Sequence, residues 1–174
     1  MEPEIKLKKH AHRDDLTGEC VWGDIGQTIL LVIFLVVWVL DSFVLRYTTF
    51  LSVYVPFYIQ LPLVVLLLIS SGYFSQAGLR IVFGETRDHP MVIHKGVFNI
   101  VRHPIYFGAV LGYLGLTLAS CSLAAFVLWL GITYFYNYIS LYEEKLLLQY
   151  FGAEYRQYMN EVPMWIPKFR KRKS

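Results

Sequence analysis

Apolar residues in this chain gather in long runs instead of alternating with polar residues. A helix needs about 20 apolar residues to cross the hydrocarbon core of a membrane, so each long run is a candidate membrane span. A polar-rich segment precedes the first run, which favours a retained span over a cleaved signal peptide. We therefore expect an all-α polytopic membrane protein with about four transmembrane helices. The four runs cover residues 25–45, 53–75, 104–119 and 123–141.

Proline and serine residues mark where these helices begin. Pro104 suits the first turn of a helix and Ser122 suits an N-cap, so we expect the third and fourth spans to begin there. Only the stretch SCS separates these two spans, which predicts a tight antiparallel helical hairpin. Pro56 and Pro62, near the start of the second run, predict a kink or a broken first turn.

The fourth helix is expected to continue beyond its apolar part. The stretch LYEEKLLLQYFG keeps helix-forming residues as far as Gly152, which suits a C-terminal cap. At a rise of about 1.5 Å per residue, a helix over residues 123–151 would be roughly 43 Å long. It would carry Glu143 and Glu144 just past the hydrocarbon, in a cytoplasmic C-terminal helical extension.

Composition supports a membrane protein, because 56% of the 174 residues are hydrophobic and the mean hydropathy is +0.45. A chain of this length holds a handful of spans with short loops, which excludes a large catalytic domain outside the membrane. The two cysteines, Cys20 and Cys121, offer no spacing for a disulfide framework. Several histidines lack a regular ligand spacing, and we expect no metal site. These histidines are His10, His12, His89 and His94.

Cations concentrate at one end of the predicted spans. They precede the first span, lie between the second and third, and follow the fourth, whereas the opposite loops carry only Arg46. The positive-inside rule then places both termini and the loop over residues 76–102 in the cytoplasm. The basic residues 168–173 would attract anionic lipid at that surface, without any need for nucleic-acid binding. Asp41 lies near the outer end of the first span, where we expect it to end the helix.

Polar residues at the inner ends of the last two helices fall on shared faces. On the third helix, His103, Tyr106 and Val110 follow i, i+3, i+7 spacing and share one face. The fourth helix presents a face of the same kind towards it. The residues of this second face are Asn137, Leu141 and Glu144.

A pocket between these two faces would suit a zwitterionic ligand. Arginine or histidine can donate to a carboxylate, and a glutamate can accept from an ammonium group. Arg102 and His103 precede the third helix, and Glu143 and Glu144 lie on the fourth. A simpler interpretation also stands at this point, in which Arg102 anchors the chain to lipid head groups and the glutamates form solvated helix surface.

Two stretches of the chain together resemble a known signature. KGVFNIVRHPIYFG and, after one helical hairpin, EEKLLLQYFGAEYRQYMNEVPMWIP are similar to the RHPxY…EE pattern of the isoprenylcysteine carboxyl methyltransferase-like family. Members of this family are integral membrane methyltransferases, and they also resemble phospholipid methyltransferases. The likeness covers residues 90–167.

The resemblance implies S-adenosylmethionine as the cofactor and suggests roles for individual residues. Arg102 matches the arginine of the motif, for which a positioning role is implied. The candidate catalytic residues are Arg102, Glu143 and Asn137. The residues implied to bind the cofactor are His94, Gly96, Val97, Phe98, His103, Tyr106, Glu143 and Glu144.

We accordingly expect residues 1–174 to form a single membrane domain. Its parts are a polar cytoplasmic N-terminus (1–24), the first two spans and their loop (25–89), the methyltransferase-like cofactor-binding region (90–167) and the basic tail (168–174).

One position departs from the family's pattern. The carboxyl methyltransferases usually carry an arginine one helical turn before the acidic pair, and this chain has Ile139 there. The departure favours an amine, thiol or hydroxyl on a small lipophilic or lipid-anchored acceptor over a prenylcysteine carboxylate. Asn137 and nearby tyrosines could frame such an acceptor, although an interfacial aromatic belt is the simpler interpretation of any one tyrosine. These tyrosines are Tyr134, Tyr136, Tyr138 and Tyr142.

Three other functions remain as alternatives. The chain could be an isoprenylcysteine-type carboxyl methyltransferase, or a non-enzymatic lipid-binding or assembly protein on the same scaffold. Membrane reductases of the sterol type share an RHP-like ending, but this chain has no additional spans with which to build a nicotinamide site.

Overall fold

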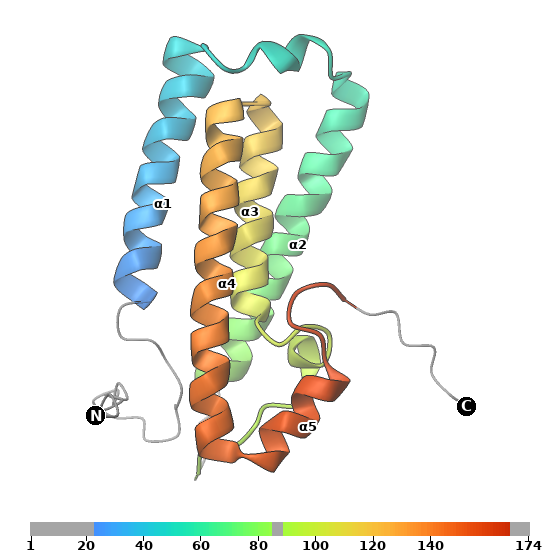
Figure 1. Ribbon diagram of the computed structural model, residues 1–174. Coiled ribbons are helices and arrows are strands. Elements are labelled where there is room, and N and C mark those ends of the chain that lie inside the picture. The colour runs from blue at the N-terminus through green and yellow to red at the C-terminus, as the bar shows by residue number, and fades with distance from the viewer. Residues whose placement is uncertain (1–22, 85–88, 168–174) are drawn as a thin grey trace.

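The computed structural model describes residues 23–84 and 89–167, and within these residues every regular element is a helix (Figure 1). The predicted all-α class is therefore confirmed for the described part of the chain. Short helical turns over Leu40–Leu45 and Phe50–Val53 connect the first two helices, and another over Gly96–Asn99 precedes the third. The five α-helices are α1 (Gly23–Val39), α2 (Phe57–Phe83), α3 (Pro104–Ser120), α4 (Leu123–Phe151) and α5 (Ala153–Glu161).

Three of the described helical segments have the length and apolar composition of membrane spans. They cover Gly23–Leu45, Phe57–Phe83 and Leu123–Phe151. The apolar helix α3 has 17 residues, which corresponds to roughly 26 Å and is shorter than a typical span. The chain is thus an integral membrane protein, while a count of four spans stays a prediction.

The hairpin of α3 and α4 forms as predicted. Pro104 occupies the first turn of α3, and the Ser122 hydroxyl caps α4 by accepting a hydrogen bond of 3.0 Å from the Ala125 N–H. Gly152 ends α4 at a φ of +57°, and its N–H donates to the Leu148 carbonyl at 3.0 Å.

The second and last helices differ from expectation. Helix α2 begins at Phe57 because Pro56 holds an extended conformation, continues through Pro62, and ends at Phe83, beyond the predicted end at residue 75. Its last two turns are less hydrophobic than a span but contain no residue that stops a helix. Gly152 also starts a separate helix, α5, which the apolar pattern did not predict.

Glycine residues allow α2 and α3 to pack closely. A side-chain carbon at Gly108 would lie 2.8 Å from the Ser71 carbonyl oxygen, and one at Gly112 would lie 2.8 Å from Ser71 Oγ. At Gly115 it would lie 2.9 Å from a methyl group of Leu68. Small residues at such spacing let helix backbones approach each other, which is how membrane helices gain packing energy.

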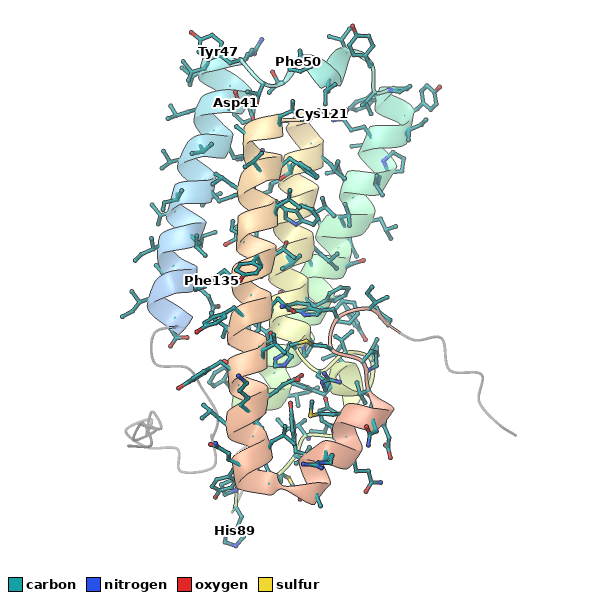
Figure 2. All side chains as sticks on the ribbon, viewed as in Figure 1. Asp41, Tyr47, Phe50, His89, Cys121 and Phe135 are labelled. Carbon is teal, nitrogen blue, oxygen red and sulfur yellow. The ribbon has the colours of Figure 1, made fainter. Side chains whose placement is uncertain are left out.

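Helix α1 is fixed to the α3–α4 hairpin along its length. Phe34 is fully buried, and its ring meets the Tyr113 ring edge to face at 4.7 Å. The indole N–H of Trp38 donates to the Leu116 carbonyl at 2.8 Å. Nearer the start of α1, Phe135 of α4 packs against Gly26 and leaves no room for a side chain there (Figure 2).

Asp41 has a larger role than ending a helix. Its carboxylate is buried and accepts hydrogen bonds of 2.5 Å from the Ser122 and Thr48 hydroxyls. These bonds compensate the cost of burying the carboxylate. They connect the C-terminal end of α1 to the turn between α3 and α4, which lies beside Asp41 in Figure 2.

The helices run in alternating directions, so the described elements separate into two ends. The connection from α1 to α2 and the turn at Cys121 lie at one end, whereas the last turns of α4 and α5 lie at the other (Figures 1 and 2). Most of the predicted polar N-terminus and all of the basic tail fall outside the described residues. The orientation of the two ends in a membrane stays a prediction.

Candidate functional site

Glu144 lies at the centre of a buried polar cluster between α3, α4 and the C-terminal segment. Its side chain projects from α4 and the residue is 3% exposed. One oxygen, Oε1, lies 2.6 Å from Arg102 Nε and 3.2 Å from His103 Nε2. A buried carboxylate needs such partners, and it receives them from the two residues that immediately precede α3.

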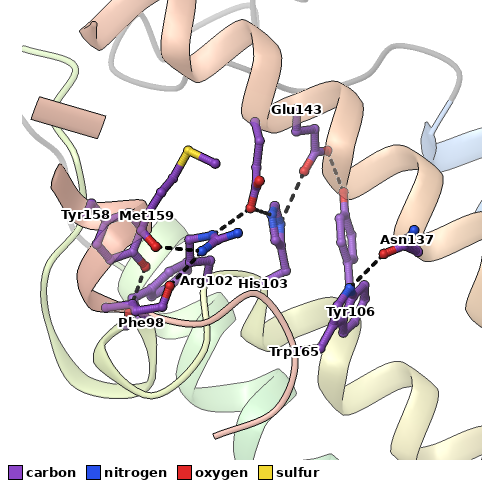
Figure 3. Close-up of polar contacts among 11 residues, drawn as sticks. Phe98, Arg102, His103, Tyr106, Asn137, Glu143, Tyr158, Met159 and Trp165 are labelled. Atoms are coloured by element: carbon purple, nitrogen blue, oxygen red, sulfur yellow. Dashed lines mark hydrogen bonds and ion pairs between the residues drawn. The ribbon is translucent and has the colours of Figure 1, made fainter. Parts of the chain in front are cut away.

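His103 lies between the two glutamates. Its Nε2 contacts Glu144, and its Nδ1 lies 3.7 Å from Glu143 Oε2 on the other side of the ring. The Tyr106 hydroxyl donates to Glu143 Oε1 at 2.6 Å, and the Tyr106 ring is parallel to the His103 ring with centroids 5.8 Å apart. Figure 3 shows this arrangement of one imidazole, one phenol and neighbouring carboxylates.

Arg102 connects the cluster to the end of the chain. Its Nη1 donates to the main-chain carbonyls of Val162 and Met159, at 2.7 Å and 3.1 Å. Its own main-chain N–H donates to the Pro163 carbonyl at 3.0 Å. Arginine suits this place because its planar guanidinium presents several donors in fixed directions.

The C-terminal segment returns across the cluster and brings in Trp165. The indole N–H donates to Asn137 Oδ1 at 3.1 Å, and the indole centroid lies 6.4 Å from the His103 ring (Figure 3). Sequence reasoning assigned no role to Trp165, although it lies in the quoted stretch VPMWIP. Its position depends on the return of the chain after α5, which local spacing does not reveal.

The predicted cofactor loop lies beside the cluster and contacts α5 and α2. The Tyr158 hydroxyl donates to the Phe98 carbonyl at 2.6 Å, and the His94 ring meets the Tyr158 ring at 4.7 Å. Burial raises the pKa of the Tyr158 phenol above its ordinary value, which keeps the hydroxyl protonated as a donor. Gly96 has a φ of +56°, and Val97 is 1% exposed, so the Val97 side chain belongs to the core.

The structure therefore brings most of the predicted site residues together. Arg102, His103, Tyr106, Glu143 and Glu144 form one connected cluster, and Asn137 joins it through Trp165. The loop over residues 94–98 is attached through Tyr158 of α5.

One residue of the face predicted for the fourth helix was placed wrongly. Leu141 is 46% exposed, so it does not share a buried face with Asn137 and Glu144. The buried stripe of α4 instead passes through Tyr136, Ser140 and Glu144, at intervals of four residues.

The tyrosines near the acidic pair divide into two groups. Tyr134 and Tyr138 are 74% and 63% exposed and point away from the protein, as residues of an aromatic belt would. Tyr136 is 4% exposed, and its ring lies 5.2 Å from the Tyr106 ring. Ile139 is 2% exposed and places an apolar side chain in the interior.

A cavity of about 550 Å³ is lined in part by Tyr136, whose ring contacts the Tyr106 ring of the cluster. Residues of α1 and α2 form its two walls, and α3 contributes most of its floor. We call it the α1–α2 groove. Its walls include Thr28 and Leu31 of α1 and Leu68 and Ser71 of α2, while Tyr136 lines it from α4.

The described residues form an α-helical integral membrane protein with a buried cluster of one arginine, one histidine and two glutamates, and the comparisons identify its family. The family model described as phospholipid methyltransferase matches residues 54–154, which is more than half of the chain. The chain therefore belongs to the phospholipid methyltransferase family. The predicted kinship with integral membrane methyltransferases is confirmed.

Several curated relatives are named as methyltransferases. Protein-S-isoprenylcysteine O-methyltransferase B of Arabidopsis thaliana is 31% identical over 81 residues, which are 46% of this chain and 41% of the relative. Methanethiol S-methyltransferase 1 of Bradyrhizobium diazoefficiens is 36% identical over 72 residues, or 41% of this chain and 24% of the relative. The Saccharomyces cerevisiae isoprenylcysteine O-methyltransferase is 36% identical over 85 residues, or 46% and 34%. The chain thus matches less than half the length of these relatives.

Proposed function

We propose that this protein is an S-adenosylmethionine-dependent methyltransferase that acts on a small lipophilic or lipid-anchored acceptor at the membrane. The observation that carries the proposal is the buried cluster of His103, Tyr106, Glu143 and Glu144 beside a groove between helices, in a chain of the phospholipid methyltransferase family. The printed names of the relatives, which are O- and S-methyltransferases, support the same reaction class.

The groups in the cluster fit the chemistry of the methionine part of this cofactor. Its ammonium group requires acceptors, which Glu143 and Glu144 supply, and its carboxylate requires donors, which His103 and Tyr106 supply. We assign the loop of His94, Gly96, Val97 and Phe98 to the same cofactor, because α5 holds it beside the cluster.

The roles proposed for the protein's residues concern binding and orientation. S-adenosylmethionine, when bound, supplies a methyl group on a positively charged sulfur. The protein then has to hold the acceptor in line and exclude water, which is catalysis by positioning. Arg102 is a positioning residue, since its guanidinium bonds to Glu144 and two main-chain carbonyls. Glu143, which accepts from Tyr106, and Asn137, which accepts from Trp165, both project from α4 toward the cluster. They are the candidates for contact with the acceptor.

A second candidate function is carboxyl methylation of a prenylcysteine, which the names of several relatives favour. The interior position of Ile139 argues against it, because that side chain offers a carboxylate no positive charge. A comparison of kcat/KM for N-acetyl-farnesylcysteine with lipophilic amines, thiols and phenols decides between the two. Clear preference for the prenylcysteine would overturn our interpretation of Ile139.

Direct binding of S-adenosylmethionine to the purified protein tests the proposed function. We expect His103→Ala and Glu143→Gln each to weaken binding by about 1.5–3 kcal/mol, the range for hydrogen bonds to charged groups. His89→Ala, at an exposed position labelled at the lower tip of the molecule in Figure 2, is the matched control and should leave the affinity unchanged. Each variant is first shown to be folded by its thermal unfolding in detergent. Wild-type affinity in both folded cluster variants, or no binding to the wild-type protein, would refute the proposal.

A further inference from the structure

Ser140 is a serine of α4 whose buried hydroxyl makes no hydrogen bond. The residue is 0% exposed. Among the buried side-chain oxygen and nitrogen atoms of the described residues, only the hydroxyls of Ser42 and Ser140 lack a partner. Such a hydroxyl has given up its bonds to water without replacing them, which costs free energy and calls for a physical reason. Ser42 lies next to Asp41 at the opposite end of the molecule, whereas Ser140 lies one helical turn from Glu144.

A local bond within α4 does not satisfy the Ser140 hydroxyl. A serine or threonine in a helix can donate to the carbonyl of the residue four positions before it. Three threonines of the described helices do so, each at 2.8 Å. They are Thr28, Thr117 and Thr133, which donate to the carbonyls of Asp24, Tyr113 and Trp129. Ser140 makes no such bond to the Tyr136 carbonyl. Its free hydroxyl is therefore a property of this position.

The position of Ser140 directs its side chain to the cluster. Residues four apart lie on one face of a helix with their Cβ atoms about 5–6 Å apart, so Ser140 lies between Tyr136 and Glu144. The Tyr136 ring, which also lines the α1–α2 groove, packs against the Tyr106 ring at 5.2 Å. Glu144 Oε1 lies 3.2 Å from His103 Nε2. Ser140 therefore faces the part of α3 that carries His103 and Tyr106.

His103 and Tyr106, the donors proposed for the cofactor's carboxylate, are already engaged within the cluster. The two ring nitrogens of His103 lie 3.2 Å from Glu144 and 3.7 Å from Glu143. The Tyr106 hydroxyl donates to Glu143 at 2.6 Å. A ligand carboxylate would have to take these donors from the glutamates. The Ser140 hydroxyl, in contrast, can donate to a ligand without breaking any bond within the protein.

We propose that Ser140 is a further cofactor-binding residue, whose hydroxyl donates to the carboxylate of the methionine part of S-adenosylmethionine. The inference rests on the proposed function and adds a residue to it. A hydroxyl suits this interior position because it binds an anion without adding a charge that would need its own partner. The desolvation cost of the buried hydroxyl is recovered when the carboxylate accepts its hydrogen bond. Loss of this hydroxyl should therefore weaken cofactor binding without weakening the fold.

Binding of S-adenosylmethionine to purified variants tests this role. Ser140→Ala removes the hydroxyl, and Ser140→Cys keeps the shape of the side chain but offers only a weak donor. We expect both to raise Kd about tenfold, near the lower end of the range for hydrogen bonds to charged groups. Thr117→Val is the matched control, because it removes a buried hydroxyl of α3 that already has a partner. Its affinity should equal that of the wild-type protein. Wild-type affinity in Ser140→Ala would overturn the proposal, and Ser140→Cys decides the question if Ser140→Ala does not fold.

Decarboxylated S-adenosylmethionine tests which group of the cofactor the hydroxyl meets. This molecule lacks the carboxylate but keeps the ammonium group and the positively charged sulfur. In the resulting double-mutant cycle, Ser140→Ala should change its Kd by less than about twofold, because the proposed acceptor is missing. An equal loss of affinity for the two molecules would overturn the assignment to the carboxylate.

Thermal unfolding in detergent without added ligand separates a binding role from a structural one. Ser140→Ala should unfold at the wild-type temperature or above it, since it removes a buried group that has no partner. A lower unfolding temperature would show that the hydroxyl stabilises the fold and would overturn the proposal. No binding of S-adenosylmethionine to the wild-type protein would refute the proposed function and the inference with it. Wild-type binding that Ser140→Ala leaves intact would refute only the inference.

Discussion

Arg102 satisfies more partners than any other side chain in the described site. It pairs with the carboxylate of Glu144 and donates to two carbonyls of the chain that follows α5. A buried carboxylate that loses its cationic partner keeps its desolvation cost without compensation, which makes such pairs sensitive to the removal of one member. The Arg102–Glu144 pair should therefore matter for folding as well as for binding.

Arg102→Ala should lower the free energy of unfolding by about 3–5 kcal/mol, because Glu144 would stay buried without its partner. Chemical unfolding in detergent measures this change. Arg156→Ala removes an exposed arginine of α5 and is the control, with an expected change within about 0.5 kcal/mol. The double variant Arg102→Ala/Glu144→Gln should be more stable than Arg102→Ala alone. A double variant no more stable than the single variant would show that the buried charge is not the cause.

The residues of the site could be found from the sequence, but their partners could not. Spacing placed His103 and Tyr106 on one face and the glutamates opposite them, and the contacts agree with that arrangement. The main-chain partners of Arg102 and the Trp165 partner of Asn137 lie on α5 and the returning C-terminal segment, and no periodicity within a helix indicates where such a segment will pack. Leu141 was misplaced because three residues turn a helix by about 300°, which puts Leu141 about 60° from Glu144 and at the exposed edge of the face.

At the scale of helices, the packing of α2 on α3 depends on residues without side chains. The closest neighbours of Gly108 include main-chain atoms of α2, which cannot rotate away as a flexible side chain can. Gly131 on α4 has no atom within 4 Å of the position that a side-chain carbon would take. The same substitution at these two glycines should therefore have opposite effects.

We predict that Gly108→Ala is destabilising and that Gly131→Ala stabilises the protein by about 0.5–1 kcal/mol. At Gly131 the added methyl group fits and the helix gains from the lower backbone freedom of alanine. At Gly108 it would lie 2.8 Å from the Ser71 carbonyl oxygen and push the two helices apart. Thermal unfolding of the two variants beside the wild-type protein measures both effects. A stabilised Gly108→Ala would mean that α2 and α3 are less closely packed than described.

Element ends were predictable wherever a single residue determines them. Ser122 and Gly152 bound α4 as expected, because a capping hydroxyl and a left-handed glycine act locally. The end of α2 was missed because hydropathy falls before the helix ends, and the last turns of α2 contain Arg80. Helix α5 was missed because it is short and its only buried residues, Tyr155 and Tyr158, do not form an apolar run.

At the scale of the whole molecule, the two ends differ in chemistry. One end carries the polar cluster, the loop over residues 94–98 and α5, and the other carries short connections with exposed aromatic residues such as Tyr47 and Phe50 (Figure 2). The predicted topology puts the cations of the sequence, apart from Arg46, on the side of the first of these ends, where an anionic leaflet and a soluble cofactor would both be found. The positive-inside rule thus predicts that the candidate site faces the cytoplasm.

Cysteine labelling of intact cells tests this orientation. In a variant whose two native cysteines are replaced, Lys95→Cys reports on the loop before α3 and Val53→Cys reports on the opposite end. Both positions are exposed, and Val53 is 84% exposed, so failure to react would reflect sidedness rather than burial. We expect a membrane-impermeant maleimide to label Val53→Cys from outside and to label Lys95→Cys only after the cells are opened. Because the cluster, the loop over residues 94–98 and α5 lie at one end, efficient external labelling of Lys95→Cys would place the whole candidate site outside, away from cytoplasmic S-adenosylmethionine, and would contradict both the topology and the proposed function.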